Sequence, residues 1–351
     1  MISMRCKYVV PLYFLLTMAS KSTWAAAYHV YVTNHMSNDV TAIASTTHSL
    51  IGAVKTVANP DGIAVTLDGR RAYVVNQTLH KVSVIDTTSL TIIGNPIPVG
   101  TFPRGITISP DGTKMYVANQ ESDTVSVIDI GTNSVSTISG AGRGPFQIAI
   151  TPNGAFAYVT NSAANTVSLI NLETNTVVEL ITVGLRPHGI VITPDGNYVY
   201  VANSITGTVS VIHTATNRVV DTIRRLGSLP EGLAITPDGT SIYVTRSASN
   251  AVSRIITSTN TVDPNSISVE NFPEGIAITP DGAYAYVVNS SSETVSVIDL
   301  ATNCVTRESI PVGANPGRGI AIAIPPSSIV ETQKQNYQKR KKDRKHSYIS
   351  F

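Results

Sequence analysis

A strand that ends in nearly the same four residues occurs seven times along the chain. The copies are Tyr31–Asn34, Tyr73–Asn76, Tyr116–Asn119, Tyr158–Asn161, Tyr200–Asn203, Tyr243–Arg246 and Tyr286–Asn289. Successive tyrosines lie 42 or 43 residues apart. A period of about 40 residues built from short strands is typical of propeller blades. The repeat therefore predicts an all-β, seven-bladed β-propeller, in which each blade contacts only its two neighbours.

Each full repeat contains four strand-like runs. In one copy they are Gly189–Ile192, Tyr198–Asn203, Val209–Ile212 and Arg218–Ile223. The first two are joined by Thr-Pro-Asp-Gly, in which Pro presets φ and Gly accepts a positive φ. The short connections between the runs predict four-stranded antiparallel blades.

The first strand-like run of the repeat, which precedes the tyrosine strand in a full copy, is missing before the first copy and is left over after the last. It begins at Gly62, Gly105, Gln147, Gly189, Gly232, Gly275 and Gly319. The first Tyr-Val-Thr-Asn strand has no such run before it, and the last run, 319–324, has no strands after it. We therefore expect 319–324 to be the innermost strand of the first blade and to pair with 28–34. This pairing would close the ring and leave no free sheet edge there.

Several short motifs carry a family resemblance. They are Thr-Pro-Asp-Gly, Val-Ser-Val-Ile-Asp at Val125–Asp129 and Val295–Asp299, and Ile-Pro-Val-Gly at Ile97–Gly100 and Ile310–Gly313. Together with the tetrapeptide they resemble the YVTN β-propeller family over essentially all of 28–324. The resemblance implies a secreted, periplasmic or surface-layer protein that binds a partner or serves a structural role. It implies no shared catalytic residues.

The sixth copy departs most from the repeat. Arg246 replaces the asparagine, Arg254 and Ile256 interrupt the Val-Ser-Val-Ile-Asp run, and Pro264 interrupts the fourth strand. Proline is tolerated on edge strands. The departures indicate either drift at the outer edge or an adapted contact face.

Residues 1–27 have the pattern of a secretory signal peptide. Arg5 and Lys7 precede an apolar run, Val9–Ala19, which is too short to span a bilayer, and Ala25–Ala27 forms a small-residue cleavage site. Residues 28–324 form the expected propeller. The protein is therefore expected to be exported to the periplasm, the cell surface or the medium. No other apolar stretch is long enough for a transmembrane segment.

Residues 325–351 are expected to form a disordered basic tail. Its basic block comprises Lys339, Arg340, Lys341, Lys342, Arg344 and Lys345. Such a block is either a solvated tail or a site for an anionic partner such as lipid, polysaccharide or nucleic acid. Residues 1–27 carry a net charge of +3 and residues 325–351 carry +5, which leaves −6 for the propeller. An acidic body argues against a general nucleic-acid surface on the ring.

Motifs for common propeller chemistry are absent from the sequence. It contains neither Cys-x-x-Cys-His for covalent haem nor a Gly-x-Ser-x-Gly nucleophile elbow. One position nevertheless carries a chemically different side chain in almost every blade. It is the residue just before each predicted innermost strand, usually the middle residue of a Pro-x-Gly motif. This position should lie at one mouth of the central channel. Its residues are Asp61, Arg104, Phe146, His188, Glu231, Glu274 and Arg318.

These residues permit three interpretations. His188, Glu231 and Glu274 follow one another on consecutive blades and could bind a divalent metal. The seven residues, with Arg186 as the expected counter-charge for the two glutamates, could instead form a ligand site in which His188, Glu231 and Glu274 hold a sugar or a cationic ligand. They could also pair with one another as a solvated ring of charges.

Two functional hypotheses follow. The favoured one is an exported binding or interaction scaffold, monomeric and needing no cofactor, that holds a protein or polysaccharide partner at the mouth. The alternative is a metal-assisted hydrolase or lactonase-like enzyme that uses the same residues.

Overall fold

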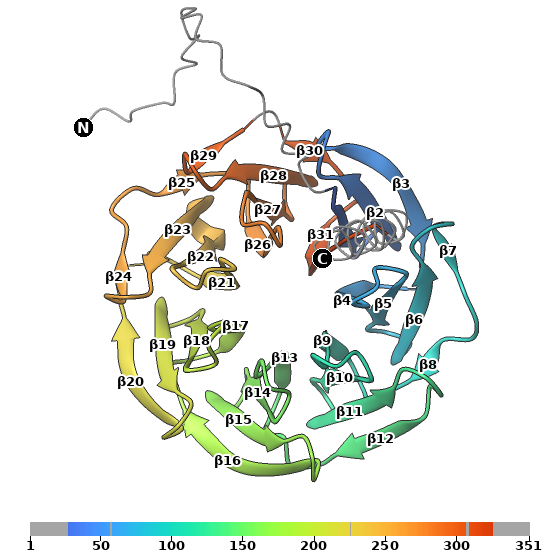
Figure 1. Cartoon of the computed structure of the whole chain (residues 1–351), viewed down its shortest axis with the longest axis horizontal. Helices are drawn as coiled ribbons and strands as arrows, with labels where there is room; N and C mark the ends of the chain where they lie inside the picture. Colours follow the sequence, from blue (N-terminus) through green and yellow to red (C-terminus); the bar gives the residue numbers. More distant parts are fainter. Residues whose placement is uncertain (1–26, 57, 225, 307–308, 326–351) are drawn as a thin grey trace, which may run out of the picture.

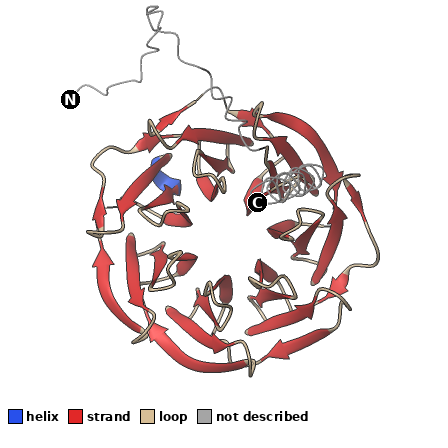
Figure 2. Ribbon diagram, in the orientation of Figure 1, coloured by secondary structure: helices blue, strands red, loops and turns tan. Residues whose placement is uncertain are grey.

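The computed structural model describes residues 27–325, apart from 57, 225 and 307–308. Its strands form seven antiparallel sheets around a central axis (Figure 1). The described chain is almost entirely strand and loop (Figure 2), with a single-turn 3-10 helix, η1 (Ser247–Ser249). The predicted seven-bladed propeller is therefore confirmed. The predicted signal peptide and the basic tail lie outside the described residues, apart from Ala27 and Pro325.

The blades are numbered by their tyrosines. Blade 1 holds β1 (His29–Asn34), β2 (Asp39–Ala44), β3 (Ser49–Lys55) and the last strand, β31 (Pro316–Ala323). Blade 2 holds β4 (Pro60–Val65), β5 (Arg71–Asn76), β6 (Lys81–Asp86), β7 (Thr91–Ile92) and β8 (Ile97–Pro98). Blade 3 holds β9 (Pro103–Ile108), β10 (Lys114–Asn119), β11 (Thr124–Asp129) and β12 (Val135–Ile138). Blade 4 holds β13 (Pro145–Ile150), β14 (Phe156–Asn161), β15 (Thr166–Asn171) and β16 (Thr176–Thr182).

The remaining blades follow the same order. Blade 5 holds β17 (Pro187–Ile192), β18 (Tyr198–Asn203), β19 (Thr208–His213) and β20 (Arg218–Ile223). Blade 6 holds β21 (Pro230–Ile235), β22 (Ser241–Arg246), β23 (Ala251–Ile256), β24 (Thr261–Val262) and β25 (Ile267–Ser268). Blade 7 holds β26 (Pro273–Ile278), β27 (Tyr284–Asn289), β28 (Thr294–Asp299), β29 (Cys304–Val305) and β30 (Ile310–Pro311).

In blades 2, 6 and 7 the outermost strand is divided into two short pieces, both paired with the third strand of the blade. In blade 6 the interruption between β24 and β25 contains Pro264. Proline has no amide hydrogen to donate to the ladder, so the interruption falls where the sequence predicted it.

The ring closes through β31. This strand pairs with β1 in antiparallel register, from His29 opposite Ala323 to Val32 opposite Ile320, in a sheet of order β3-β2-β1-β31. Figure 1 shows β31 on the inner side of blade 1. The predicted closure is confirmed, although the strand begins earlier than expected, at Pro316. A bulge opposite Thr33 accommodates the additional residues.

The core is divided into clusters that lie between neighbouring blades. One cluster contains Tyr31 of blade 1 together with Val74 of blade 2, and the other six repeat this arrangement around the ring. The repeated tyrosines are all fully buried. In blade 6 the hydroxyl of Tyr243 donates to Asn303 Oδ1 of blade 7 at 2.6 Å. Each tyrosine thus packs in an interface between blades and contributes to the ring as a whole.

The repeated asparagine joins the second and third strands of its own blade. In blade 3, Asn119 Nδ2 donates to Thr124 Oγ1 at 3.1 Å and to Ser126 Oγ at 3.0 Å. The asparagines of the other five blades that carry one also donate to the equivalent serine or threonine hydroxyls. All six are fully buried. The residue is therefore structural, because it bonds across the hairpin of its own blade.

Candidate functional site

The seven variable residues lie where the innermost strands begin. Every innermost strand starts with proline. The variable residue comes second in six of these strands and third in β31, where it is Arg318. All seven strands begin at the same end of the ring, so their side chains converge on one mouth of the channel. The structure joins them into one connected network.

One part of the network is an ion pair between blades 2 and 3. Arg104 Nη1 lies 3.0 Å from Asp61 Oδ2. Gln77 Nε2 donates to the same carboxylate oxygen, and Arg104 Nε donates to Gln120 Oε1 at 2.8 Å. The two glutamines directly follow the repeated asparagine, where the sequence analysis did not look for site residues. Blades 4 to 7 carry serine at that position, and blade 1 carries His35, whose Nε2 lies 2.9 Å from Gln77 Oε1. Side-chain length was therefore the feature that could have revealed these residues.

The other part of the network spans blades 5, 6, 7 and 1. Arg318 Nη2 lies 2.7 Å from Glu274 Oε1 and 3.3 Å from Glu231 Oε2. His188 Nδ1 lies 2.5 Å from the same oxygen of Glu231. The guanidinium therefore bridges two carboxylates on adjacent blades, which would otherwise repel each other.

Phe146 connects the two parts. Its ring stacks on the imidazole of His188, with the ring centroids 4.2 Å apart. The guanidinium carbons of Arg104 and Arg318 lie 5.4 and 5.2 Å from the centroid of the same ring. These separations are those of cation–π contacts. The mouth thus contains three carboxyl groups and two arginines, and both arginines contact the ring of Phe146.

Burial differs between the acidic and basic members. The side chains of Arg104 and Arg318 are 22% and 26% exposed, whereas those of Asp61, Glu231 and Glu274 are only 8%, 7% and 12% exposed. The charges that solvent meets at this mouth are therefore mainly guanidinium groups. The network matches the predicted ring of paired charges, except that its carboxylates are buried rather than solvated.

The two glutamates have pKa values displaced in opposite directions. Burial raises the pKa of Glu274 above its usual range, and Arg318 offsets this only in part. Burial also opposes ionisation of Glu231, but hydrogen bonds from His188 and the charge of Arg318 outweigh it and lower the pKa of Glu231. Burial lowers the pKa of His188 despite its bond to Glu231, so its imidazole is neutral near pH 7. An ionised Glu231 accepts a hydrogen bond, so the proton of His188 sits on Nδ1.

A cavity of about 80 Å³ lies in the channel directly behind the network. The charged side chains of Glu231, Glu274 and Arg318 line it, together with Phe146 and the inward-facing backbone of the innermost strands. A space of this size has room for water molecules but not for a sugar.

The metal prediction receives no support from the structure. Among the described residues, no group of three or more His, Cys, Asp and Glu side chains is placed to hold a metal ion. The reason is Arg318, whose positive charge sits between the two carboxylates that a metal would need. Arg186 was expected to be their counter-charge, and that expectation was wrong. Its side chain is exposed, and no carboxylate of the described chain lies within 4.0 Å of it.

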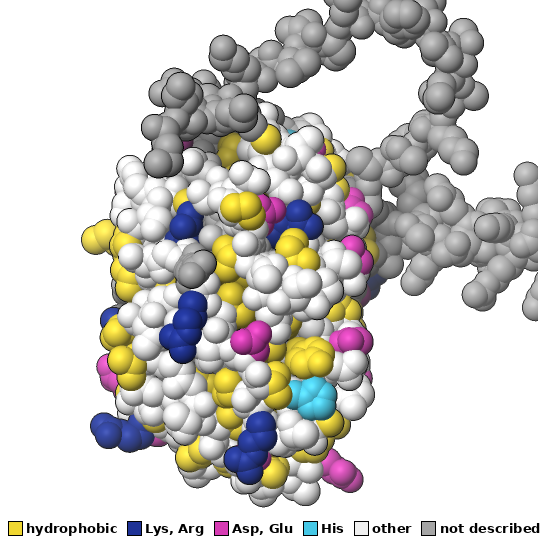
Figure 3. Space-filling model, turned by 90° about the vertical axis from the view of Figure 1, so that its left-hand side faces the viewer, with side chains coloured by type: hydrophobic (Ala, Val, Ile, Leu, Met, Phe, Trp, Pro, Cys, Tyr) yellow, Lys and Arg dark blue, Asp and Glu magenta, His cyan; other side chains and the backbone are white. Residues whose placement is uncertain are grey.

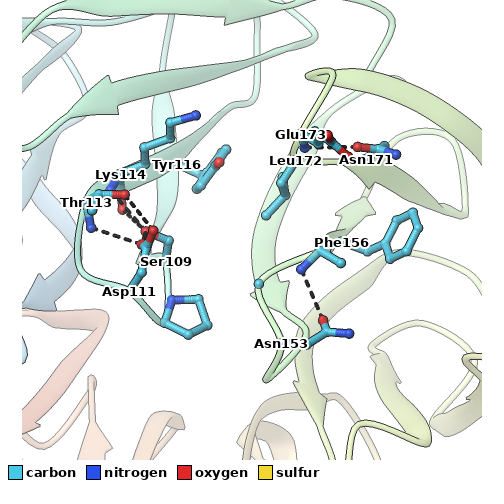
Figure 4. A pocket seen from close by; sticks show the side chains of 13 residues that line it. Ser109, Asp111, Thr113, Lys114, Tyr116, Asn153, Phe156, Asn171, Leu172 and Glu173 are labelled. Carbon is cyan, nitrogen blue, oxygen red and sulfur yellow. Dashed lines mark hydrogen bonds between the residues drawn. The ribbon is translucent and has the colours of Figure 1, made fainter.

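A larger hollow lies on the opposite face, between blades 3 and 4. It has a volume of about 720 Å³, and its lining includes Asp111, Lys114, Asn153, Phe156 and Leu172 (Figure 4). The side chains of Ser109, Asp111, Thr113, Asn153 and Asn171 in its lining form hydrogen bonds within local turns. Hydrogen bonds from Ser109 and Thr113 lower the pKa of Asp111 to about 2. A similar groove follows between blades 4 and 5, so this feature belongs to the repeat rather than to one specialised site.

Comparison with known families supports the fold. A lactonase, 7-bladed β-propeller model matches residues 23–137, and a YNCE-like β-propeller model matches residues 145–245. Each covers less than half of the chain. They support a propeller of this general kind, while the finer likeness to the YVTN family stays a resemblance. A comparison with curated proteins gave no match.

Several solved structures share the architecture. Hydrazine synthase from Kuenenia stuttgartiensis is 24% identical, with 82% of this chain and 99% of that chain covered and a TM-score of 0.71. A periplasmic gluconolactonase from Pseudomonas aeruginosa is 18% identical, with coverages of 86% and 100% and a TM-score of 0.71. A putative 6-phosphogluconolactonase from Bacteroides fragilis is 19% identical, with coverages of 87% and 100% and a TM-score of 0.71. At these identities the likeness is one of fold.

No helix within the described residues is long and apolar enough to cross a membrane.

Proposed function

We propose that the channel mouth hydrolyses a lactone that carries an anionic group. The observation that carries this proposal is the pair Glu231 and Glu274, which share Arg318 yet have pKa values displaced in opposite directions. Separated pKa values on neighbouring carboxyl groups commonly mark a division of roles in acid–base catalysis. The lactonase family match and the gluconolactonase structures favour ring opening of a cyclic ester as the reaction.

The two arginines would select the substrate. They are the most exposed charged groups of the network, so an incoming ligand meets positive charge first. Guanidinium groups bind carboxylate and phosphate through paired hydrogen bonds. Arg104 would hold the anionic group of the substrate, and Arg318 would face the lactone carbonyl oxygen.

Glu274 would act as the general base, because a raised pKa brings a carboxyl group closer to the pH at which it works. It takes a proton from a water molecule in the cavity, and the water oxygen attacks the carbonyl carbon. Arg318 stabilises the oxyanion that forms. The ring C–O bond then breaks, and the alkoxide receives the proton from Glu274. Glu231 and His188 are positioning residues that hold Arg318 in place.

We expect Glu274→Gln to lower kcat for lactone opening by about 100-fold or more, with a much smaller change in KM. The amide keeps the shape of the side chain but cannot accept the proton. In the wild type, kcat should rise with pH as Glu274 ionises, with a midpoint above the usual glutamate range. The measurement is proton release in a pH-stat with six-membered sugar lactones that carry a carboxylate or phosphate.

Glu173→Gln is the matched control, because Glu173 lies in the groove of the opposite face and its loss should leave the rate unchanged. The proposal fails if wild-type protein opens none of these lactones, or if Glu274→Gln opens them at the wild-type rate.

A binding scaffold without catalysis is the second candidate. It is favoured by the closed ion-pair network and by a cavity too small for a substrate. In that case the open-chain acids would bind at the mouth and be lost on Arg104→Ala, while no lactone would be turned over. Calorimetric titration with the open-chain acid, beside the lactone assay, separates the two.

We further propose that the protein works after export, as the signal-peptide pattern of residues 1–27 predicts. The similarity to a periplasmic gluconolactonase supports this location. Mass spectrometry of protein from its native cells should find the mature N-terminus at Tyr28. An intact Met1 on that protein would contradict export by cleavage.

A further inference from the structure

Blade 6 carries an arginine where the other six blades carry the buried asparagine. Arg246 Nη1 donates to the carbonyl oxygen of Leu226 at 3.0 Å. Its Nε is buried and has no hydrogen-bond partner among the described residues. No carboxylate in the described part of the chain lies within 4.0 Å of its guanidinium. Blade 6 therefore encloses a positive charge with which no carboxylate of the described chain is paired.

This arginine lines a groove at the outer rim of the ring. The groove has a volume of about 640 Å³ and runs between β20 of blade 5 and the divided outer strand of blade 6. Its polar lining is Asp221, Arg224, Arg246, Ser253, Asn260 and Asp263, with further hydroxyls from Thr222, Thr261 and Ser266. Figure 3 views the rim from the side that carries β20 and β24, where charged side chains of both signs are scattered among hydrophobic ones.

The interruption in the outer strand opens this groove inward. Pro264 and Ser266 lie in the gap between β24 and β25, and the groove reaches Ser253 of the third strand. Blades 2 and 7 have a similar gap but keep the asparagine. Blade 6 is therefore the blade that combines the gap with a cation behind it. The combination favours an adapted contact face over drift.

We propose that this groove binds the carboxylate-bearing sugar unit of an acidic saccharide, with the carboxylate on Arg246. A guanidinium that no carboxylate of the described chain pairs with favours an anionic ligand, and a carboxylate can accept hydrogen bonds from its Nη groups, since Nε is closed to solvent. The acceptors of a sugar's hydroxyl groups would be Asp221 and Asp263, which line the same groove. Asn260 also lines it, but its Oδ1 already accepts a hydrogen bond from the hydroxyl of Tyr200 at 2.8 Å. Asp221 and Asp263 disfavour a compact multiply charged anion such as phosphate, because each would repel it.

The two aspartates retain acceptor capacity for this role. Asp221 accepts one hydrogen bond, from the amide of Thr222. Asp263 accepts one from the amide of Asn265, and its other oxygen lies 4.0 Å from Arg254 Nη1. A carboxylate has about four acceptor positions, so both can take further hydrogen bonds from hydroxyl groups. This groove shares no residue with the channel mouth, and the inference does not depend on the proposed lactone hydrolysis.

The test is calorimetric titration of the whole protein with glucuronate and galacturonate, beside glucose, acetate and inorganic phosphate. The uronates should bind, and glucose should bind at least about tenfold more weakly because it lacks the carboxylate. Arg246→Asn should weaken uronate binding at least about tenfold as well. This variant restores the residue of the other six blades, so the ring should still fold.

A second variant tests whether the uronates bind at the channel mouth instead of the groove. Arg104→Ala removes the outer cation of the channel network and should leave Arg246-dependent uronate binding unchanged. The proposal is overturned if wild-type protein binds no uronate, or if Arg246→Asn binds it with the wild-type affinity. Equal affinity for acetate and uronate would overturn the role of the sugar hydroxyls, and preference for phosphate would overturn the assignment to a carboxylate.

Discussion

A chain that ends at Asn315, and so lacks β31, should lose the cooperative folding of the whole ring. The innermost strand of blade 1 would be missing, and β1 would expose an unpaired edge to the channel. Ile320 and Ile322 pack against the cluster shared with blade 7, and Ala323 packs in the cluster shared with blade 2. Removing these partly buried aliphatic side chains together with a whole strand of the ladder costs about 5 kcal/mol or more, which is comparable to the entire stability of many domains. Thermal unfolding followed by circular dichroism measures the effect.

The matched control is a chain that lacks only residues 327–351. Every described strand remains in this truncation, so its melting temperature should equal that of the full chain. If the two truncated chains melt at the same temperature, closure by β31 does not stabilise the ring. The Arg318→Met variant, described below, shows how much of the effect comes from that one side chain.

The fold was predictable because its information is local and repeated. The tyrosine period gave the number of blades, and the unpaired strands at the two ends of the chain gave the closure. The division of the outer strands in blades 2 and 7 was not predicted. Outer strands are largely solvent-exposed, so their sequences carry little hydrophobic alternation from which pairing could be inferred. The starts of all seven innermost strands were also missed. Each strand begins at a proline before the predicted run, and the bulge between the two interrupts the alternation from which a strand is inferred.

The mouth residues were predictable from their place in the repeat, but their partners were not. Because Glu231, Glu274 and Arg318 each stand just before an innermost strand, the sequence placed them at one end of the ring. Which of them touch depends on side-chain length and rotamer across several blades, and a local pattern does not encode this. Arg186 was expected beside the glutamates because it is near His188 in sequence. Its left-handed backbone, with φ of 54°, belongs instead to the turn that enters β17, and Arg318 fills the position from blade 1, the neighbour of the blade that carries Glu274.

Arg318→Met should destabilise the ring at neutral pH by about 3 kcal/mol, because it leaves two buried carboxylates side by side without their shared cation. Wild-type Glu231 has a lowered pKa, so it contributes stability above its unfolded pKa that is lost as pH falls through the folded value. Without Arg318 the pKa values of both glutamates should rise above their unfolded values. Such groups favour the folded state only when protonated, and that contribution is lost as pH rises through the folded pKa.

The destabilisation should therefore depend on pH in a defined direction. The difference in melting temperature between wild type and Arg318→Met should be largest at about pH 7 to 8 and should shrink towards about pH 4, where the carboxyl groups become protonated. Arg104→Met is the matched control, since Arg104 pairs with the single carboxylate of Asp61, which also accepts a hydrogen bond from Gln77. Its effect should be smaller and less dependent on pH. If the loss in Arg318→Met is the same at pH 4 and pH 7, Arg318 contributes packing rather than charge, and the division of roles between Glu231 and Glu274 loses its electrostatic basis.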